Sequence, residues 1–298
     1  MVRLSIIVPT KDERTAPDVI GELYKVFGKD TEVIVVDKSN DTFRKELEKT
    51  DARIIRQESD GYENALMEGF REARGDVIAT IDADGTYSVR DLEKVIAALS
   101  DGDADFVSGN RFGHLKEGAM SASLKIGNGF LTWLYNVMYR RKLHDALSGV
   151  FAMKRKAFES IKEELPYRAG TIFFEIEIAR RGWRLKDIPI TYAPRMGSSS
   201  KIARVKPIYG LAMAFHSVRY ARDYNPLLIF GGIGIILVIA GLVLGAFVIG
   251  NYLATGTLSE IGRALIAFML MVLGFLSIMT GFILDLLLEI SRDMHRKR

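Results

Sequence analysis

Residues 75–87 read GDVIATIDADGTY, and this stretch decides how the first part of the chain folds. A mainly apolar run, 77–81, ends in two acids, Asp82 and Asp84, with Ala83 between them. A short apolar run bounded by turn residues is typical of a buried strand. The two acids have two interpretations. Asp and Gly commonly form turns, whereas neighbouring carboxylates can hold a divalent metal ion.

Strand and helix patterns alternate through the residues on both sides of this stretch. Strands are predicted at 4–10, 31–37, 52–57, 76–84 and 104–110, and helices at 17–27, 42–50, 62–74 and 88–99, the last with Ser88 as its N-cap. Apolar strands that alternate with helices predict a parallel sheet covered by helices on both faces. Ligands bind beyond the carboxyl ends of such strands. We therefore expect Pro9, Thr10, Asp37, Asp82 and Asp84 to line one crevice.

Two long uncharged runs, 227–250 and 264–284, lie towards the end of the chain. About 20 apolar residues are enough for a helix to cross a bilayer, so two membrane spans are predicted, at about 227–250 and 264–286. Long buried helices of a soluble protein are the alternative, and it is disfavoured because both runs are apolar all round. Gly241 and Gly245 have the spacing of close helix contacts, within one chain or in a homo-oligomer.

Charge placement predicts how these spans are oriented. Residues 195–222 contain six Lys and Arg and no acid, and the last eight residues add four more basic side chains. Basic flanks stay in the cytoplasm, so both flanks are expected there and the short loop between the spans outside. The chain contains no cysteine, and its start shows no signal-peptide pattern. Both observations also suit a cytoplasmic location for the soluble part that precedes the two spans. The net charge of +4 is attributed to the membrane-facing patch, and no nucleic-acid motif is present.

Two other segments, 121–141 and 205–225, mix aromatic and basic residues with apolar ones. This mixture is typical of helices that lie in the membrane interface against lipid headgroups. Plain core helices are the alternative for both segments. Segment 205–225 lies directly before the first predicted span, which favours an interfacial helix over a core helix for this segment.

Phosphate chemistry is suggested at two places. Asp82 and Asp84 would hold Mg²⁺ or Mn²⁺ and leave coordination positions for diphosphate oxygens. The segment YAPRMGSSSKI, residues 192–202, places Arg195 and Lys201 on either side of a Gly/Ser loop. Such a loop can fold over phosphates, although it can also be a basic linker next to the membrane.

The order of these and other motifs resembles that of the family 2 inverting glycosyltransferases of GT-A fold. The motifs are VPTKDE (8–13), VIVVD (33–37), GDVIATIDADG (75–85), GNRF (109–112), DALSGVFAMKR (145–155), FFEIEIARRGWRLKDIPI (173–190) and RMGSSSK (195–201). Within that family the chain resembles the polyprenyl-phosphate (dolichyl-phosphate) hexose synthases, over residues 3–220. The resemblance implies a Rossmann-like α/β domain at 1–204, an amphipathic interfacial helix at 205–225 and a two-helix membrane anchor at 226–298.

The resemblance also implies roles, position by position. The nucleotide pocket would contain Pro9, Thr10, Glu13 and Asp37, and the metal and diphosphate site Asp82 and Asp84. The acceptor phosphate would meet Arg111 and Lys125. A mobile basic loop that closes on the donor would supply Arg195, Ser200 and Lys201. Asp145 and Glu175 fall on acidic positions usual in the family.

The reaction so implied is the transfer of one hexose from UDP- or GDP-hexose to a polyprenyl phosphate, with inversion. A phosphate monoester is already anionic near neutral pH, with a second pKa of about 6, so it needs no strong base. Asp145 and Glu175 are therefore expected to position groups rather than to act as bases. As alternatives, Asp145 is a turn acid, and Glu175 pairs with Arg180 or Arg181 on its helix.

Three residues depart from the family's pattern: Lys38 replaces an acid, Glu63 a glycine, and Thr86 a glutamine. These departures leave the third metal ligand, the sugar and the nucleotide open. A processive polysaccharide synthase is one alternative function, and it is disfavoured because only two spans follow and Gly182 precedes Trp183. A membrane-tethered binding protein without activity is another.

Overall fold

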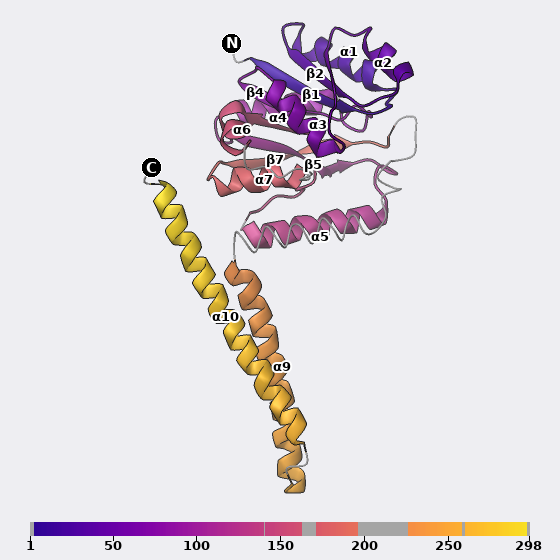
Figure 1. Ribbon diagram of the computed structural model, residues 1–298. Coiled ribbons are helices and arrows are strands. Elements are labelled where there is room, and N and C mark those ends of the chain that lie inside the picture. The colour runs from indigo at the N-terminus through magenta and orange to yellow at the C-terminus, as the bar shows by residue number, and fades with distance from the viewer. Residues whose placement is uncertain (1–2, 140, 163–170, 196–225, 258–259, 297–298) are drawn as a thin grey trace. The chain divides into compact units, whose positions relative to one another are not determined.

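The structure is a computed structural model that describes residues 3–139, 141–162, 171–195, 226–257 and 260–296. The chain divides into two compact units, residues 1–213 and 214–298. The first unit contains a layered α/β domain and the second a pair of long helices (Figure 1). The segment 205–225, predicted as an interfacial helix, lies outside the described residues, as do Ser200 and Lys201.

The described part of the first unit holds one seven-stranded sheet in the order β3-β2-β1-β4-β6-β5-β7. Its strands are β1 (Leu4–Thr10), β2 (Glu32–Asp37), β3 (Arg53–Arg56), β4 (Val77–Thr80), β5 (Phe106–Leu115), β6 (Phe151–Lys154) and β7 (Leu185–Tyr192). All neighbouring pairs are parallel except those of β6, which runs antiparallel to both β4 and β5. The predicted mostly parallel α/β sheet is therefore confirmed.

Helices cover both faces of this sheet because successive strand residues point to opposite sides. Ile6 and Val8 of β1 belong to one buried cluster, together with side chains of α1 (Ala16–Phe27) and α4 (Val89–Ser100). Ile7 belongs to a second cluster, with side chains of α3 (Tyr62–Glu72), α6 (Arg155–Ile161) and α7 (Thr171–Arg180). Two further helices, α2 (Asp41–Leu47) and α5 (Ala122–Tyr139), complete the described helices of this unit.

Local sequence sets the ends of several helices. Pro17 lies in the first turn of α1, where its missing N–H is not needed. The Asn40 side chain caps α2 by accepting from the backbone N–H groups of Thr42 and Phe43. Ser88 is the N-cap residue of α4 as predicted, but its side chain makes no cap hydrogen bond. Asp91 in the first turn of α4 instead accepts from the N–H of Thr191 in β7, at 2.8 Å, and so ties α4 to the sheet.

The second unit consists of α9 (Pro226–Thr255) and α10 (Ile261–Arg296), which contain two stretches long and apolar enough to cross a membrane. Most of their large apolar side chains are exposed in the chain itself, including Ile236 and Phe268. This exposure argues against core helices of a soluble protein and suits contact with lipid. The two helices pack closely at glycines, since a Cβ on Gly234 would lie 2.5 Å from the carbonyl oxygen of Gly274. Gly241 likewise faces α10 of the same chain.

Candidate active site

The loops at the carboxyl edge of β1, β2 and β4 are joined by hydrogen bonds. Thr10 and Asp37 lie directly opposite each other in the β1–β2 register. Asp12, which has a positive φ of 54°, donates its N–H to the Ser39 hydroxyl at 2.8 Å and accepts from the N–H of Asn40 at 2.9 Å. The β1 strand also pairs with β4 in parallel, so the three predicted strand ends lie at one edge of the sheet.

The Thr15 hydroxyl of the first loop donates to the carbonyl of Ala83, between the two acids, at 2.6 Å. The buried Thr10 hydroxyl and one buried Asp37 oxygen have no hydrogen-bond partner within the described residues. Polar atoms buried in this way are normally satisfied, so they suit a polar ligand at this edge. Pro9 precedes Thr10 in β1, opposite Val36.

Asp82 and Asp84 follow β4 on a loop, each held by a neighbouring hydroxyl. Asp82 Oδ1 accepts from the Tyr62 hydroxyl at 2.6 Å. Asp84 Oδ1 accepts from the Thr86 hydroxyl at 2.6 Å and from the Thr86 N–H at 3.1 Å. Burial, and then the neighbouring charge of Asp84, raise the pKa of Asp82 to about 7. A carboxylate whose charge is disfavoured by burial and by a second carboxylate beside it suits a cation at this place.

The donor set around these acids fits a divalent cation that shares its coordination with a substrate. Among the residues that the structure describes, no group of three acidic or histidine side chains is arranged to hold a metal. Mg²⁺ commonly takes one or two protein carboxylates and completes its shell with phosphate oxygens and water. Asp82 and Asp84 match that pattern, with Thr86 supporting Asp84 where a third ligand was left open.

Arg195 brings a positive charge to the same acids from the end of β7. Its guanidinium pairs with Glu13 of the β1–α1 loop, and its Nε lies 3.7 Å from Asp84 Oδ2. All three side chains are less than 20% exposed. Two predicted residues, Glu13 and Arg195, are therefore brought together with Asp84, although 182 positions separate Arg195 from Glu13.

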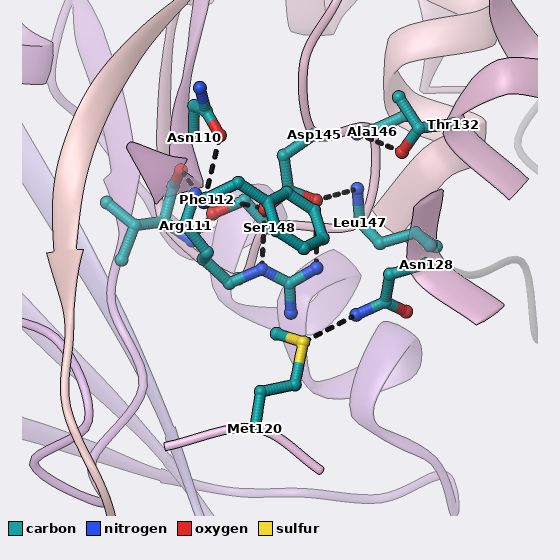
Figure 2. A network of polar contacts seen from close by, with 12 residues as sticks. Asn110, Arg111, Phe112, Met120, Asn128, Thr132, Asp145, Ala146, Leu147 and Ser148 are labelled. Carbon is teal, nitrogen blue, oxygen red and sulfur yellow. Dashed lines mark hydrogen bonds and ion pairs between the residues drawn. The ribbon is translucent and has the colours of Figure 1, made fainter. Parts of the chain in front are cut away.

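Arg111 of β5 is held by Asp145 in a buried bidentate pair (Figure 2). Arg111 Nε donates to Asp145 Oδ2 at 2.6 Å and Nη2 donates to Oδ1 at 2.8 Å. The backbone N–H groups of Arg111 and Leu147 donate to the same carboxylate at 3.1 Å each. Asp145 therefore fixes the orientation of the Arg111 guanidinium. Figure 2 shows the third guanidinium nitrogen directed away from Asp145.

The charge of Arg111 reaches the acidic pair, because it lowers the pKa of Asp82 against the larger effect of burial. The guanidinium also lies over the Tyr192 ring, 5.7 Å from its centroid. Lys125, the other predicted phosphate ligand, is exposed on α5. The structure thus places Arg111 beside the site, and Lys125 on the surface of a different element.

Glu175 is buried in α7, and burial raises its pKa well above the usual value. Of the two arginines in the alternative ion pair, Arg180 pairs with Glu177, at 2.7 Å. Burial disfavours the charged form of this carboxyl group. Glu175 is thus a buried acid of this fold.

Two residues at this edge were missed by the sequence analysis, Tyr62 and Gly149. Tyr62 opens α3 directly after the β3 loop, a position at the carboxyl edge that could have drawn attention to it. Gly149 lies within the DALSG motif, and a Cβ there would lie 2.6 Å from Asp82 Oδ2. Only the folded chain shows that both residues touch Asp82.

Acidic and arginine side chains thus gather at the carboxyl edge of a mostly parallel sheet, where such folds bind ligands. Residues 5–162, just over half of the chain, match the model of glycosyl transferase family 2. The chain belongs to that family, and the predicted resemblance is confirmed.

Relatives of known name agree with this assignment. Glycosyltransferase AglJ of Haloferax volcanii is 27% identical over 98% of this chain and 96% of its own length. A dolichyl-phosphate hexose transferase of the same organism is 29% identical over 66% of this chain and 85% of its own length. Dolichol-phosphate mannosyltransferase of Pyrococcus furiosus is 27% identical over 67% of this chain and 59% of its own.

Solved structures share the fold at low sequence identity. Glucosyl-3-phosphoglycerate synthase of Mycobacterium tuberculosis, in complex with Mn²⁺, UDP and phosphoglyceric acid, superposes with a TM-score of 0.57. It is 16% identical over 72% of this chain and 78% of its own. Mannosyl-3-phosphoglycerate synthase of Rubrobacter xylanophilus, 17% identical over 75% of each chain, gives a TM-score of 0.58. Both likenesses concern the fold.

Proposed function

We propose that this glycosyltransferase moves one hexose from a nucleoside diphosphate sugar to a polyprenyl (dolichyl) phosphate, with inversion and with Mg²⁺ or Mn²⁺. The observation that carries the proposal is the grouping at one edge of Asp82 and Asp84 with two arginines, Arg195 and Arg111. The printed names of two relatives, a dolichyl-phosphate hexose transferase and a dolichol-phosphate mannosyltransferase, support the acceptor.

The two arginines suit the two ends of the reaction. Arg195, beside Asp84, would bind the diphosphate that leaves with the electrons of the broken C1–O bond. Arg111, fixed by Asp145, would bind the acceptor phosphate through its remaining N–H groups. A bound divalent cation would supply additional neutralisation of the leaving diphosphate. Attack by a phosphate oxygen on the face of C1 opposite the leaving group inverts that carbon.

No side chain need remove a proton in this scheme, because the acceptor phosphate attacks as an anion. Asp145 serves by orienting Arg111, since both of its oxygens already accept hydrogen bonds. Pro9, Thr10, Glu13 and Asp37 would hold the nucleotide. Lys125 is proposed as a second ligand of the acceptor phosphate. Ser200 and Lys201, which follow Arg195 in the sequence, are proposed as further ligands of the donor.

The proposed acceptor requires that the enzyme work at a membrane. The helix α5 supports this location, because Ile126, Phe130, Trp133 and Val137 form an apolar stripe at helical spacing and are 73%, 53%, 57% and 39% exposed. An exposed stripe with a tryptophan suits the bilayer interface. We propose that α9 and α10 anchor the chain, with the glycosyltransferase domain and the C-terminal tail in the cytoplasm.

A donor panel tests the proposed function. Membranes that contain the full-length protein would be incubated with a polyprenyl phosphate and Mn²⁺. Parallel samples would each receive one labelled donor: UDP-glucose, UDP-N-acetylglucosamine or GDP-mannose. We expect one donor to give a labelled lipid whose anomeric configuration is opposite to that of the donor. A product with retained configuration, or label only in a growing polysaccharide, would contradict the proposal. Binding of a donor without any transfer would favour a binding protein.

A further inference from the structure

Asp82 accepts a hydrogen bond from a tyrosine that no step of the proposed reaction uses. The Tyr62 hydroxyl donates to Asp82 Oδ1 at 2.6 Å, a short bond of the strength expected for a carboxylate acceptor. The Tyr62 ring packs against the buried cluster beneath α3. Because the ring is held by the core, the hydroxyl is a fixed donor rather than a mobile surface group.

Gly149 packs against the same carboxylate. A Cβ at this position would lie 2.6 Å from Asp82 Oδ2, closer than real Cβ contacts allow, and 3.1 Å from both Asp82 Cγ and Asp82 Oδ1, which is tight. The Gly149 N–H donates to the hydroxyl of Tyr87 at 3.0 Å, and Tyr87 is itself buried and packed against Tyr192. The backbone at Gly149 is therefore anchored, and it cannot easily retreat from a larger side chain.

We propose that Tyr62 is a positioning residue for the acidic pair, with Gly149 as the wall against which it holds Asp82. The Tyr62 hydroxyl on Oδ1 and the bare Gly149 backbone against the carboxylate group fix the carboxylate in one orientation next to Asp84. This orientation sets the affinity of the site for a divalent cation carrying a nucleoside diphosphate. The inference rests on the proposed function, because it assigns Tyr62 a part in the cation site.

Groups that hold metal-binding carboxylates typically change metal affinity by 10- to 100-fold when they are removed. Tyr62→Phe removes only the hydroxyl and keeps the ring in the core. Tyr24→Phe is a matched control, because the Tyr24 hydroxyl donates to the carbonyl of Asp51 at the surface. Asp51 precedes β3, so this bond lies at the opposite edge of the parallel strands.

The experiment measures Mn²⁺ binding directly, by the electron paramagnetic resonance signal of free Mn²⁺. Purified full-length protein in detergent would be titrated with Mn²⁺ at saturating UDP and, separately, GDP. We expect Tyr62→Phe to raise the Mn²⁺ Kd by about tenfold, with an unchanged thermal unfolding midpoint, and Tyr24→Phe to match the wild type. Gly149→Ala, which must displace the Asp82 carboxylate, should raise the Kd further.

The outcomes separate this inference from the function on which it rests. A Mn²⁺ Kd of Tyr62→Phe equal to that of the wild type overturns the positioning role and leaves the proposed transfer intact. Equal weakening in Tyr62→Phe and Tyr24→Phe also overturns it, because the effect would not be local. A wild-type protein that transfers hexose but binds no Mn²⁺ with either nucleotide overturns the inference and the cation requirement together.

Discussion

Replacement of Asp145 by alanine should destabilise the glycosyltransferase domain strongly. The Asp145 side chain is fully buried and the side chain of Arg111 is 10% exposed. Asp145→Ala leaves a buried guanidinium without its counter-ion and two backbone N–H groups without an acceptor. Breaking a buried pair in this way costs about 3–5 kcal/mol, a large part of the roughly 5–15 kcal/mol by which domains are stable.

Urea unfolding followed by tryptophan fluorescence measures this cost in the full-length chain. Both tryptophans, Trp133 and Trp183, lie within the first compact unit, so the signal reports that unit. Asp51→Ala is the matched control, because its ion pair with Lys29 is exposed, with side-chain exposures of 69% and 83%. Loss of such a pair should cost less than about 1 kcal/mol.

The double replacement Arg111→Ala with Asp145→Ala should cost clearly less than the sum of the two single replacements, because the second removes a group already left unpaired. If Asp145→Ala were as mild as Asp51→Ala, or if the two losses simply added, the buried bidentate pair would not exist. The proposed anchoring of Arg111 for the acceptor phosphate would then lose its basis.

Three further predictions concern other parts of the chain. Hydrogen bonds from Arg184, together with Lys154, lower the pKa of Asp105 in the folded protein. The unfolded value is about 3.9. The stabilisation from this carboxylate is therefore present above a pH of about 3.9 and is lost as the pH falls through the lower, folded pKa. Asp105→Asn should therefore flatten the fall in unfolding free energy between about pH 5 and pH 2. Gly234→Leu should lower the thermal stability of the α9–α10 pair in detergent, measured by circular dichroism, because a Cβ there meets the Gly274 carbonyl, whereas Gly232→Leu, with nothing within 4 Å, should not. In a Trp183→Phe background, brominated lipids should quench Trp133 fluorescence in liposomes, whereas quenching no greater than with unbrominated lipid would contradict the interfacial position of α5.

The sheet and the membrane helices could be predicted because local patterns determine them. The apolar strands before Asp37 and Asp82 and the uncharged run 227–250 are visible within short windows of sequence. The antiparallel direction of β6 was not visible, because four residues, Phe151–Lys154, carry no information about direction. Nor was the contact of Asp91 visible, because its side chain accepts from Thr191, a hundred positions away.

The site residues were partly predictable for the same reason. Strand ends gave Thr10, Asp37 and the acidic pair, the basic Gly/Ser loop gave Arg195, and the resemblance supplied Arg111. The contacts that define the geometry join distant positions: Tyr62 with Asp82, Arg111 with Asp145, and Glu13 with Arg195. No periodicity signals such pairs, and only the folded sheet brings them into contact.

The most direct test of the account is the transfer of labelled hexose to polyprenyl phosphate by wild-type protein and by Asp84→Ala, each with Mn²⁺ and with a chelator. We predict that the wild type forms labelled lipid only with the cation present. Asp84→Ala should form none under either condition, while its tryptophan fluorescence unfolding stays close to that of the wild type. Undiminished transfer by Asp84→Ala, or by the wild type with chelator, would contradict the claim that the two aspartates hold a cation against the leaving diphosphate.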